Sequence, residues 1–335
     1  MESAPPAISA ERLVRRYGSL VAVDEVDLAV RTGEIYGFIG PNGAGKSTLT
    51  RVLCTLAAPS SGRATVAGYD VVTQADKVRL SIGAALQEAA LDDRQTGAEM
   101  LALQGRFYGL SRAATRARVA ELTDLIDIGE ALGRRVGTYS GGMKRRLDVA
   151  LALVHRPVVL FLDEPTTGLD PVSRSRVWQE VRRLNTELNM TVFLTTQYLE
   201  EADALADRVG IISHGKLVAE GTPEELKRSI GDDVITVQLT GSPEAARRAL
   251  ESIGVVQRIE AAGTTLTVSV SDGPAAITPV AVALSELPDL DVQEISLRRP
   301  SLDDVFLSVT GEHLSRPGAA PLDGDAAAES PRETP

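Results

Sequence analysis

Cysteine and histidine are scarce in this sequence. Its 335 residues include one cysteine, Cys54, and three histidines, His155, His214 and His313. A single cysteine excludes an internal disulfide and a zinc site built on a cysteine cluster. The histidines lie far apart in the sequence, without the short spacing of metal ligands. The sequence therefore offers no cysteine- or histidine-based metal centre.

Long apolar runs and basic tracts are also lacking. No run approaches the roughly 18 residues that a membrane-spanning helix needs, and residues 1–6 lack the basic start and apolar stretch of a signal peptide. The 35 Lys and Arg residues are outnumbered by 46 Asp and Glu residues, which gives a net charge of −11. A net acidic chain without a basic tract is a poor candidate for a nucleic-acid binder. We expect a cytosolic protein with no nucleic-acid partner.

The length of the chain suggests about two folded domains. Hydrophobic residues make up 43% of the 335, enough for a sizeable core. From residue 8 to about 230, apolar runs at 35–39, 158–162 and 191–196 suit buried parallel strands and alternate with helical patterns. This alternation predicts an α/β layer architecture. Between about 91 and 145 the apolar spacing is helical, without a strand run, so we predict a helical insertion there.

A second domain is predicted over residues 232–314. Its expected elements follow the order strand, helix, strand, strand, helix, strand, which is the ferredoxin-like α+β pattern. Ser242 precedes the first of these helices and is a suitable N-cap. Residues 315–335 are rich in Pro, Ala, Gly and acidic residues and have almost no large apolar side chain. Such a segment cannot bury enough surface to offset its ordering entropy, so we predict a disordered tail.

The short segment 301–310 is amphipathic. Leu302, Val305, Phe306 and Val309 recur at helical spacing and form an apolar stripe. The stripe must cover something, and the sequence leaves three alternatives open: the sheet of its own domain, a second chain, or a membrane partner.

A glycine-rich loop carries the first chemical motif. It matches the pattern G-x-x-x-x-G-K-[ST], follows a predicted strand and opens a predicted helix. Glycines let successive backbone N–H groups turn toward a phosphate, and the helix N-terminus adds positive potential. The lysine can reach the β- and γ-phosphates and is also predicted to be catalytic. The serine hydroxyl can ligate Mg²⁺. The predicted nucleotide-binding residues of the loop are Gly40, Pro41, Asn42, Gly43, Ala44, Gly45, Lys46, Ser47 and Thr48.

Two carboxylates follow the predicted strand at 158–162. Asp163 would hold Mg²⁺, directly or through water, as the partner that a phosphate loop needs nearby. Glu164 is suited to polarise the attacking water as a general base. The alternative is a pair of carboxylates that merely caps a strand.

Three motifs together make the sequence resemble a known family. They occur in this order: the loop 40–48, a Ser-Gly-Gly at 140–142, and LDEPTTGLDP at 162–171. Residues 8 to about 230 look like the ATPase subunit of an ABC transporter. The remainder, with LDDVFL at 302–307, looks like the daunorubicin/doxorubicin-resistance branch of ABC exporters. The resemblance implies the P-loop NTPase fold, with ATP and Mg²⁺ as cofactors.

The resemblance assigns roles to further residues. Tyr17, in the turn after the first predicted strand, matches the aromatic ring that the family stacks on adenine; the alternative is a tyrosine on a hairpin face. Gln87 matches the glutamine that touches Mg²⁺ and water and responds to the membrane subunit; alone it could be a solvated residue.

Other matched residues belong to an interface between two subunits. In the family, the motif at Ser140, Gly141 and Gly142 opens a helix and holds the γ-phosphate of the ATP bound by the other subunit. Asp170 falls in the loop that crosses the same interface. One chain holds one phosphate loop and one Ser-Gly-Gly motif, so the resemblance implies a homodimer around two ATPs.

The sequence departs from the family pattern at two positions. Met143 stands where the motif after Gly142 usually has glutamine, and Gln197 stands where a histidine normally contacts the γ-phosphate. Gln197 can donate a hydrogen bond but cannot take a proton near pH 7. Glu164 is therefore the only strong base candidate, and the substitution at 197 could slow hydrolysis.

The predicted function is ATP hydrolysis that powers efflux of a drug or antibiotic through a separate membrane-spanning permease. The helical insertion and the segment at Gln87 are the expected docking surface, which would make the chain a peripheral protein on the cytoplasmic face of the cell membrane. An ATPase subunit for lipid or polysaccharide export has the same motifs and stays open as an alternative. A soluble ABC ATPase of translation or repair is a third, although such proteins usually carry two ATPase units or a coiled-coil insert.

Overall fold

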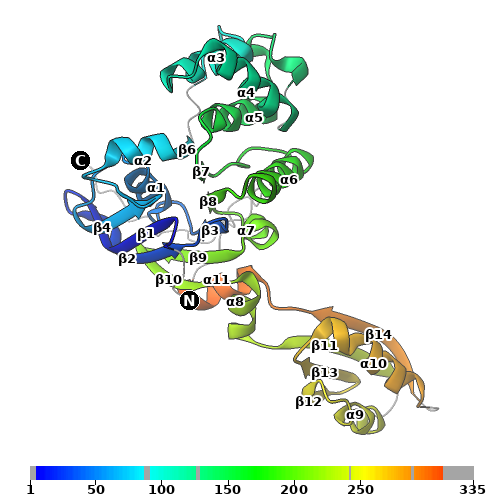
Figure 1. Cartoon of the computed structure of the whole chain (residues 1–335). Coiled ribbons are helices and arrows are strands. Elements are labelled where there is room, and N and C mark those ends of the chain that lie inside the picture. The colour runs from blue at the N-terminus through cyan, green and yellow to red at the C-terminus, as the bar shows by residue number, and fades with distance from the viewer. Residues whose placement is uncertain (1–4, 87–90, 126–128, 241–242, 288–289, 312–335) are drawn as a thin grey trace, which may run out of the picture.

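A computed structural model gives the fold. It describes residues 5–86, 91–125, 129–240, 243–287 and 290–311. Figure 1 shows a larger part, formed by residues up to 230 and the last helix, from which a smaller domain projects. The predicted site residue Gln87, the predicted N-cap Ser242 and the predicted disordered tail lie outside the described residues. Among the described helices, none combines the length and apolarity required to cross a membrane.

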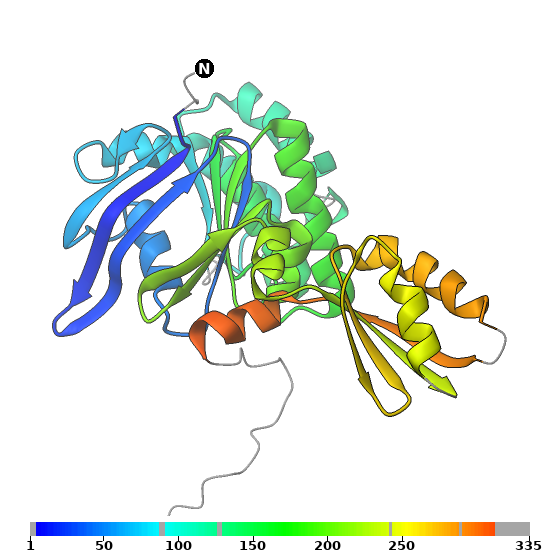
Figure 2. The same cartoon turned by 90° about the horizontal axis from the view of Figure 1, so that it is seen from below.

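A six-stranded sheet forms the centre of the larger part (Figure 2). Its order is β10-β9-β3-β8-β7-β6, and every neighbouring pair is parallel except the β9–β10 hairpin. The three apolar runs form the buried strands β3, β7 and β8, with β7 one residue later than predicted. The strand bounds are β3 Ile35–Ile39, β6 Ile82–Ala85, β7 Val159–Asp163, β8 Thr191–Thr196, β9 Arg208–Ser213 and β10 Lys216–Gly221.

A second, antiparallel sheet of order β2-β1-β4-β5 packs with helix α1 on one face of the central sheet. Leu49 and Val52 of α1 share a buried cluster with Phe161 of β7 and Phe193 of β8. The Phe193 ring lies 5.6 Å from that of Phe161. The bounds are β1 Ile8–Tyr17, β2 Leu20–Val30, α1 Lys46–Leu53, β4 Ser61–Val66, β5 Tyr69–Asp70 and α2 Ala75–Ser81.

The helical insertion and α6 pack on the opposite face. Leu160 and Leu162 alternate along β7 with the residues that face α1, because successive strand side chains point to opposite sides. They share a buried cluster with Leu147 of α5 and Val181 of α6. The segment predicted at 91–145 is helical, and its last helix continues to Leu153. The bounds are α3 Gly97–Phe107, α4 Arg112–Leu125, the 3₁₀ turns η1 Gly129–Ala131 and η2 Val136–Thr138, α5 Gly141–Leu153 and α6 Pro171–Leu188.

Several helices begin at sites that the local sequence specifies. In a capping box, the side chain of the N-cap residue accepts a backbone N–H of the first turn, and an acidic side chain three residues later accepts the N-cap N–H. Three described helices, α3, α8 and α11, start in this way. The pairs are Thr96 and Glu99, Thr222 and Glu225, and Ser301 and Asp304.

The smaller domain has the predicted ferredoxin-like order. Its antiparallel sheet has the order β12-β13-β11-β14, and helices α9 and α10 pack with it around one core. Ile235, Val237, Leu250 and Val280 are fully buried in this core. The bounds are β11 Asp233–Thr240, α9 Pro243–Glu251, β12 Val256–Ala262, β13 Thr265–Val270, α10 Gly273–Ser285 and β14 Asp291–Arg298.

The last helix returns from the smaller domain to the larger part (Figure 2). Leu302, Val305 and Phe306 of α11 are buried in a cluster with Ile39, the last residue of β3, and Leu226 of α8. Helices α7 and α8 and strand β10 contact α11. The bounds are α7 Leu199–Leu205, α8 Pro223–Ile230 and α11 Leu302–Thr310. The smaller domain is therefore anchored to the larger part through both of its ends.

This packing corrects one expectation from the sequence. The apolar stripe was expected to cover the sheet of its own domain, a second chain or a membrane partner. For Leu302, Val305 and Phe306 all three alternatives are wrong, because these side chains fill an apolar surface between α7 and α8. The fourth residue of the stripe, Val309, is 37% exposed and lies outside this buried cluster.

Candidate nucleotide-binding site

The glycine-rich loop connects β3 to α1 and is held closely by two other strands. Gly45 has φ of +112°, and a Cβ there would collide with the backbone oxygen of Ala22 in β2. A Cβ at Gly40 would lie 2.5 Å from the backbone oxygen of Ile212 in β9. Both positions thus require glycine because a Cβ has no room there. At Gly45 the positive φ also favours glycine. The loop is a preformed cradle at a helix N-terminus, a position that favours anions.

A hairpin turn clamps the loop from the side. The N–H of Gly215, between β9 and β10, donates to the carbonyl oxygen of Ala44 at 2.9 Å. The carbonyl of Gly215 accepts from the N–H of Asp24 in β2 at 2.8 Å. Gly215 therefore connects the loop to β2, a role that the sequence analysis missed, since backbone-to-backbone contacts leave no side-chain signal beyond the glycine itself.

Lys46, the first residue of α1, is almost fully buried at the centre of the loop. Its Nζ donates to the carbonyl oxygens of Gly40 at 2.7 Å and Pro41 at 3.1 Å. The same atom lies 3.5 Å from Oε1 of Glu164, and the two side chains are only 4% and 8% exposed. Burial lowers the pKa of Lys46, and the charge of Glu164 opposes this shift. The structure thus brings together two of the three residues that the sequence predicts to be catalytic.

Asp163 lies beside the second residue of α1. The hydroxyl of Ser47 donates to Oδ1 of Asp163 at 3.4 Å, and the hydroxyl of Thr195 donates to the same oxygen. Asp163 is 4% exposed. Hydroxyl and carboxylate oxygens are hard donors of the kind that Mg²⁺ prefers. Ser47 and Asp163, the two of the three predicted metal ligands that the structure describes, therefore fit that ion chemically. Thr195, which β-strand register places opposite Asp163, was not predicted.

Glu164 adopts a backbone conformation that is unusual for its residue type. Its φ is +47°, which costs a non-glycine residue about 1–3 kcal/mol. Its N–H donates to the carbonyl oxygen of Thr195 at 3.0 Å, and the Thr167 hydroxyl donates to its Oε2 at 3.2 Å. These bonds hold the strained residue so that its carboxylate faces Lys46. Backbone strain of this kind is concentrated at functional sites in proteins.

Tyr17 lies at the end of β1, where the chain turns into β2. Its side chain is 44% exposed, and the guanidinium of Arg15 stacks 4.4 Å from the centre of its ring. Tyr17 pairs with Leu20 of β2. Ala22, two residues further along β2, contacts the glycine loop. The ring thus already stacks with one planar group in this structure, and its predicted stacking on adenine stays a prediction.

The Ser-Gly-Gly motif and Asp170 lie together. Ser140 caps α5, and its Oγ accepts the N–H of Met143 at 3.3 Å, so methionine leaves this cap intact. A Cβ at Gly142 would lie 3.8 Å from Oγ of Ser173, whose N–H donates to Asp170 at 3.0 Å. The predicted site residues in this group are Ser140, Gly141, Gly142 and Asp170.

The residues of this second group begin two helices, which pack on the face of the central sheet opposite to α1. Helix α5 starts at the Ser-Gly-Gly motif and α6 starts at Asp170, and both pack on the face opposite to the phosphate loop's helix. Hydrogen bonds from Ser173 lower the pKa of Asp170, whose exposed carboxylate also caps α6. The group therefore presents backbone N–H groups and one carboxylate to solvent.

Gln197 follows β8 and is half-buried. Asp163 pairs with Thr195 between the parallel strands β7 and β8, so Gln197 and Glu164 both leave the sheet at the same edge. The neighbouring residue Thr196 accepts the N–H of Tyr198 on its hydroxyl at 2.9 Å, which bends the chain after β8. Gln197 and Glu164 thus follow neighbouring strands at one edge of the sheet, and contact of Gln197 with the γ-phosphate stays a prediction.

Comparison with known proteins identifies the family. Residues 23–167 match the family described as ABC transporter, and residues 221–310 match the ATP-binding protein DrrA1-3-like C-terminal domain. The chain is 46% identical over 310 residues to the daunorubicin/doxorubicin resistance ATP-binding protein DrrA of Streptomyces peucetius, covering 91% of this chain and 92% of that protein. The chain belongs to the ATP-binding subunits of ABC transporters.

Other relatives of this ABC ATP-binding subunit have different names. The doxorubicin resistance ATP-binding protein DrrA of Mycobacterium tuberculosis is 44% identical, with 88% of this chain and 89% of that protein covered. The Nod factor export ATP-binding protein I of Sinorhizobium fredii is 39% identical, with 92% and 87% covered. ATP binding and hydrolysis are therefore the family activity, while the relatives differ in the compound that their names mention.

Solved structures support the fold of this ABC ATP-binding subunit. An ATP-binding subunit of an ABC transporter aligns with a TM-score of 0.60 at 26% identity, over 67% of this chain and 93% of that one. The cbiO1 protein of Clostridium perfringens, part of the ABC transporter complex cbiONQ, aligns with a TM-score of 0.63 at 25% identity, over 75% and 96%. The predicted P-loop fold of the larger part is thereby confirmed.

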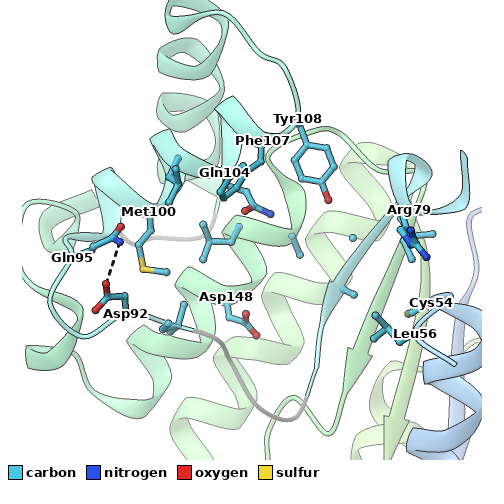
Figure 3. Close-up of a pocket in the computed structure, with 17 residues that line it drawn as sticks. Cys54, Leu56, Arg79, Asp92, Gln95, Met100, Gln104, Phe107, Tyr108 and Asp148 are labelled. Atoms are coloured by element: carbon cyan, nitrogen blue, oxygen red, sulfur yellow. Dashed lines mark hydrogen bonds between the residues drawn. The ribbon is translucent and has the colours of Figure 1, made fainter. Parts of the chain in front are cut away.

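A groove separates the helical insertion of this ABC subunit from its nucleotide-binding part (Figure 3). It has a volume of about 510 Å³ and runs between α1, α2 and β6 on one side and α3 and α5 on the other. Its rim carries the exposed apolar side chains Leu56 and Phe107, which are 60% and 75% exposed. Asp148 of α5 contributes a carboxylate to the groove. Strand β6, on the groove wall, leads directly to the segment that contains Gln87.

Proposed function

We propose that this chain hydrolyses ATP to power efflux of a drug or antibiotic through a separate membrane-spanning permease. The observation that carries the proposal is the buried constellation of Lys46, Ser47, Asp163 and Glu164 around the glycine loop. The DrrA relatives, which are named for daunorubicin and doxorubicin resistance, support a drug as cargo.

The constellation can bind and hydrolyse ATP with its own residues. The loop N–H groups and Lys46 would hold the phosphates, since a charged donor makes stronger hydrogen bonds than a neutral one. Ser47 and Asp163 would ligate Mg²⁺, which neutralises charge on the phosphates when it is bound. Glu164 would polarise the attacking water, a contribution that is typically about 10²–10⁴-fold. Gln197 would donate a hydrogen bond to the terminal phosphate.

We propose that two copies of the chain complete the site. The motif at 140–142 presents backbone N–H groups at the start of α5, on the sheet face opposite to α1. This arrangement supports a contact with the ATP held by a second copy, with Asp170 crossing the same interface. Tyr17, exposed at the end of β1, would stack on the adenine of its own ATP.

The groove is the proposed docking site for the permease. Leu56 and Phe107 give the groove rim exposed apolar surface that a docked permease could cover. Strand β6 of the groove wall precedes Gln87 in the sequence, and we propose that Gln87 responds to the docked permease. Docking there would place the chain on the cytoplasmic face of the cell membrane, as a peripheral subunit.

Transport by the chain together with its permease tests the proposal. Cells that express both are loaded with doxorubicin, and the loss of its fluorescence from the cells is followed. We expect energy-dependent loss with the natural chain, no loss with Lys46→Ala, and normal loss with Lys77→Ala, which removes an exposed lysine of α2. If the purified pair hydrolyses ATP but moves no drug, the proposed cargo is wrong. If it hydrolyses no ATP, the assignment of the site is wrong.

Lipid or polysaccharide export is the second candidate, because the Nod factor export relative is 39% identical. Under this alternative the pair would hydrolyse ATP, and loss of the gene would leave drug susceptibility unchanged while a glycolipid or polysaccharide disappears from the cell surface. Analysis of surface glycolipids in the deletion strain distinguishes the two cargoes.

A further inference from the structure

Arg145 connects three segments that surround the nucleotide site. It lies in the second turn of α5, five residues after Ser140. Its Nη1 donates to the carbonyl oxygen of Leu86 and its Nη2 to that of Ala85, each at 3.2 Å. Its Nη2 also lies 3.5 Å from the carbonyl oxygen of Asp163. One side chain of the Ser-Gly-Gly helix thus holds the end of β6 and the end of β7.

Only arginine can make this set of contacts. The acceptors are backbone oxygens at the ends of neighbouring parallel strands, and the planar guanidinium offers five donors in a fixed fork. A lysine at position 145 would retain the charge but would present one nitrogen. The Arg145 side chain is 11% exposed, and its Nε has no hydrogen-bond partner among the described residues.

The charge partner of Arg145 lies in the groove. Oδ2 of Asp148 is 3.0 Å from Nη1 of Arg145, one turn along α5. Asp148 also lines the groove, where Figure 3 shows its carboxylate below Gln104 and Met100. The ion pair therefore spans the distance between the groove and the strand end at Asp163.

This ion pair is not explained by stability. Burial raises the pKa of Asp148 to about 6, and Arg145 only partly offsets this effect. A carboxyl whose pKa is raised on folding destabilises the folded state when it is ionised at neutral pH. Buried ion pairs often contribute less stability than apolar residues of the same volume. The pair is therefore weak evidence for a purely stabilising role.

We propose that Arg145 is a positioning residue that couples the groove to the nucleotide site. A partner that occupies the groove would shift Asp148 and Arg145, and with them the strand end that carries Asp163 and Glu164. This inference rests on the proposed ATPase function and adds a residue that transmits docking. Because coupling between two binding sites is reciprocal, nucleotide binding must also change the groove, and this can be measured without the permease.

Hydrogen exchange of the purified full chain tests the coupling. Exchange is followed by mass spectrometry with and without a non-hydrolysable ATP analogue and Mg²⁺, at residues 40–53 for the loop and at 82–86 and 97–107 for the groove. In the natural chain we expect nucleotide to slow exchange at least threefold in both regions. In Arg145→Lys we expect nucleotide to slow exchange in the loop as before. The slowing of exchange in the groove should fall to less than half of that in the natural chain. Arg156→Lys, at an exposed ion pair with Glu121, is the matched control and should behave as the natural chain.

The outcomes separate this inference from the function on which it rests. If Arg145 has only a structural role, its substitution would speed exchange equally with and without nucleotide. The nucleotide-dependent difference in the groove would then persist, which would overturn the proposal. A natural chain that protects the loop but not the groove also overturns it. Absence of protection at the loop contradicts nucleotide binding itself, and the inference falls with it. If Arg145→Lys does not fold, Asp148→Asn serves in its place, and an undiminished groove effect in that variant overturns the proposal.

Discussion

The Nζ atom of Lys46 and Oε1 of Glu164 lie 3.5 Å apart in a buried ion pair at the nucleotide site. Each of these charges compensates the other, because both side chains are removed from water. A bound phosphate group would compete with Glu164 for Lys46. Under the proposed function, nucleotide binding would thereby release the carboxylate for contact with water.

Lys46→Ala should abolish nucleotide turnover and weaken ATP binding at least tenfold. The substitution removes charge-assisted hydrogen bonds, each worth about 1.5–3 kcal/mol, and leaves Glu164 buried without its partner. Titration with a fluorescent ATP analogue measures the affinity, and phosphate release measures turnover. Unchanged turnover in the purified variant with its permease would contradict the role of the loop.

Glu164→Gln should bind ATP but hydrolyse it about 10²–10⁴-fold more slowly, because the amide keeps the shape of the side chain and cannot accept the proton. Trapped ATP should also hold two chains together. Light scattering after gel filtration with ATP and Mg²⁺ shows whether the variant becomes a dimer. A variant that stays monomeric argues against the shared site, and one with normal hydrolysis argues against Glu164 as the base.

Phe306→Ala should destabilise the larger part of the molecule, not the smaller domain. Phe306 is 1% exposed and packs beside Ile39, so its truncation should cost about 3–5 kcal/mol. Val309→Ala, on the same helix and 37% exposed, is the matched control and should change stability by less than about 0.5 kcal/mol. Urea unfolding followed by the fluorescence of Trp178, in α6, reports on the larger part. Equal effects of the two substitutions would contradict the observed packing of α11.

The stability of Asp148→Asn relative to the natural chain should increase as the pH rises. The folded pKa of Asp148 is about 6, above its ordinary value of 3.8. Stability from the protonated form is therefore fully present below about pH 4 and is lost as the pH rises through 6. Asparagine stays uncharged but leaves the buried Arg145 without its charge partner, which costs stability at every pH. Between pH 5 and pH 8 the variant should nevertheless gain about 1–2 kcal/mol relative to the natural chain. Urea unfolding at the two pH values measures the difference, and a gain independent of pH would contradict the buried ionised state.

The nucleotide site was largely predictable because its signals are local or follow from parallel-strand geometry. The glycine loop occupies consecutive residues, and Asp163 ends an apolar run, so a parallel sheet brings both to one edge. The predicted roles of Tyr17, Gln197 and the Ser-Gly-Gly motif required the family resemblance. These roles remain predictions, and Gln87 lies outside the described residues.

Other features could not be predicted because their partners are distant or are backbone atoms. Nothing near Phe306 in the sequence indicates that the surface covering it is formed by Ile39 and Leu226. Arg145 binds carbonyl oxygens, which every residue type has, so its acceptors at Ala85 and Leu86 carry no sequence pattern. Gly215 likewise clamps the loop through backbone bonds alone.

The return of α11 to the larger part means that order along the chain and order in space differ. In space, the smaller domain is an insertion between two helices of the ATP-binding part, α8 and α11, and the chain enters and leaves it at one side. A deletion that begins after Gly231 removes Phe306 as well as the domain, and uncovers apolar residues next to the phosphate loop. Replacing residues 232–300 with a flexible linker would remove the module and keep its anchor. The ATP-binding core is thus completed by a helix that the chain reaches only after it has formed the smaller domain.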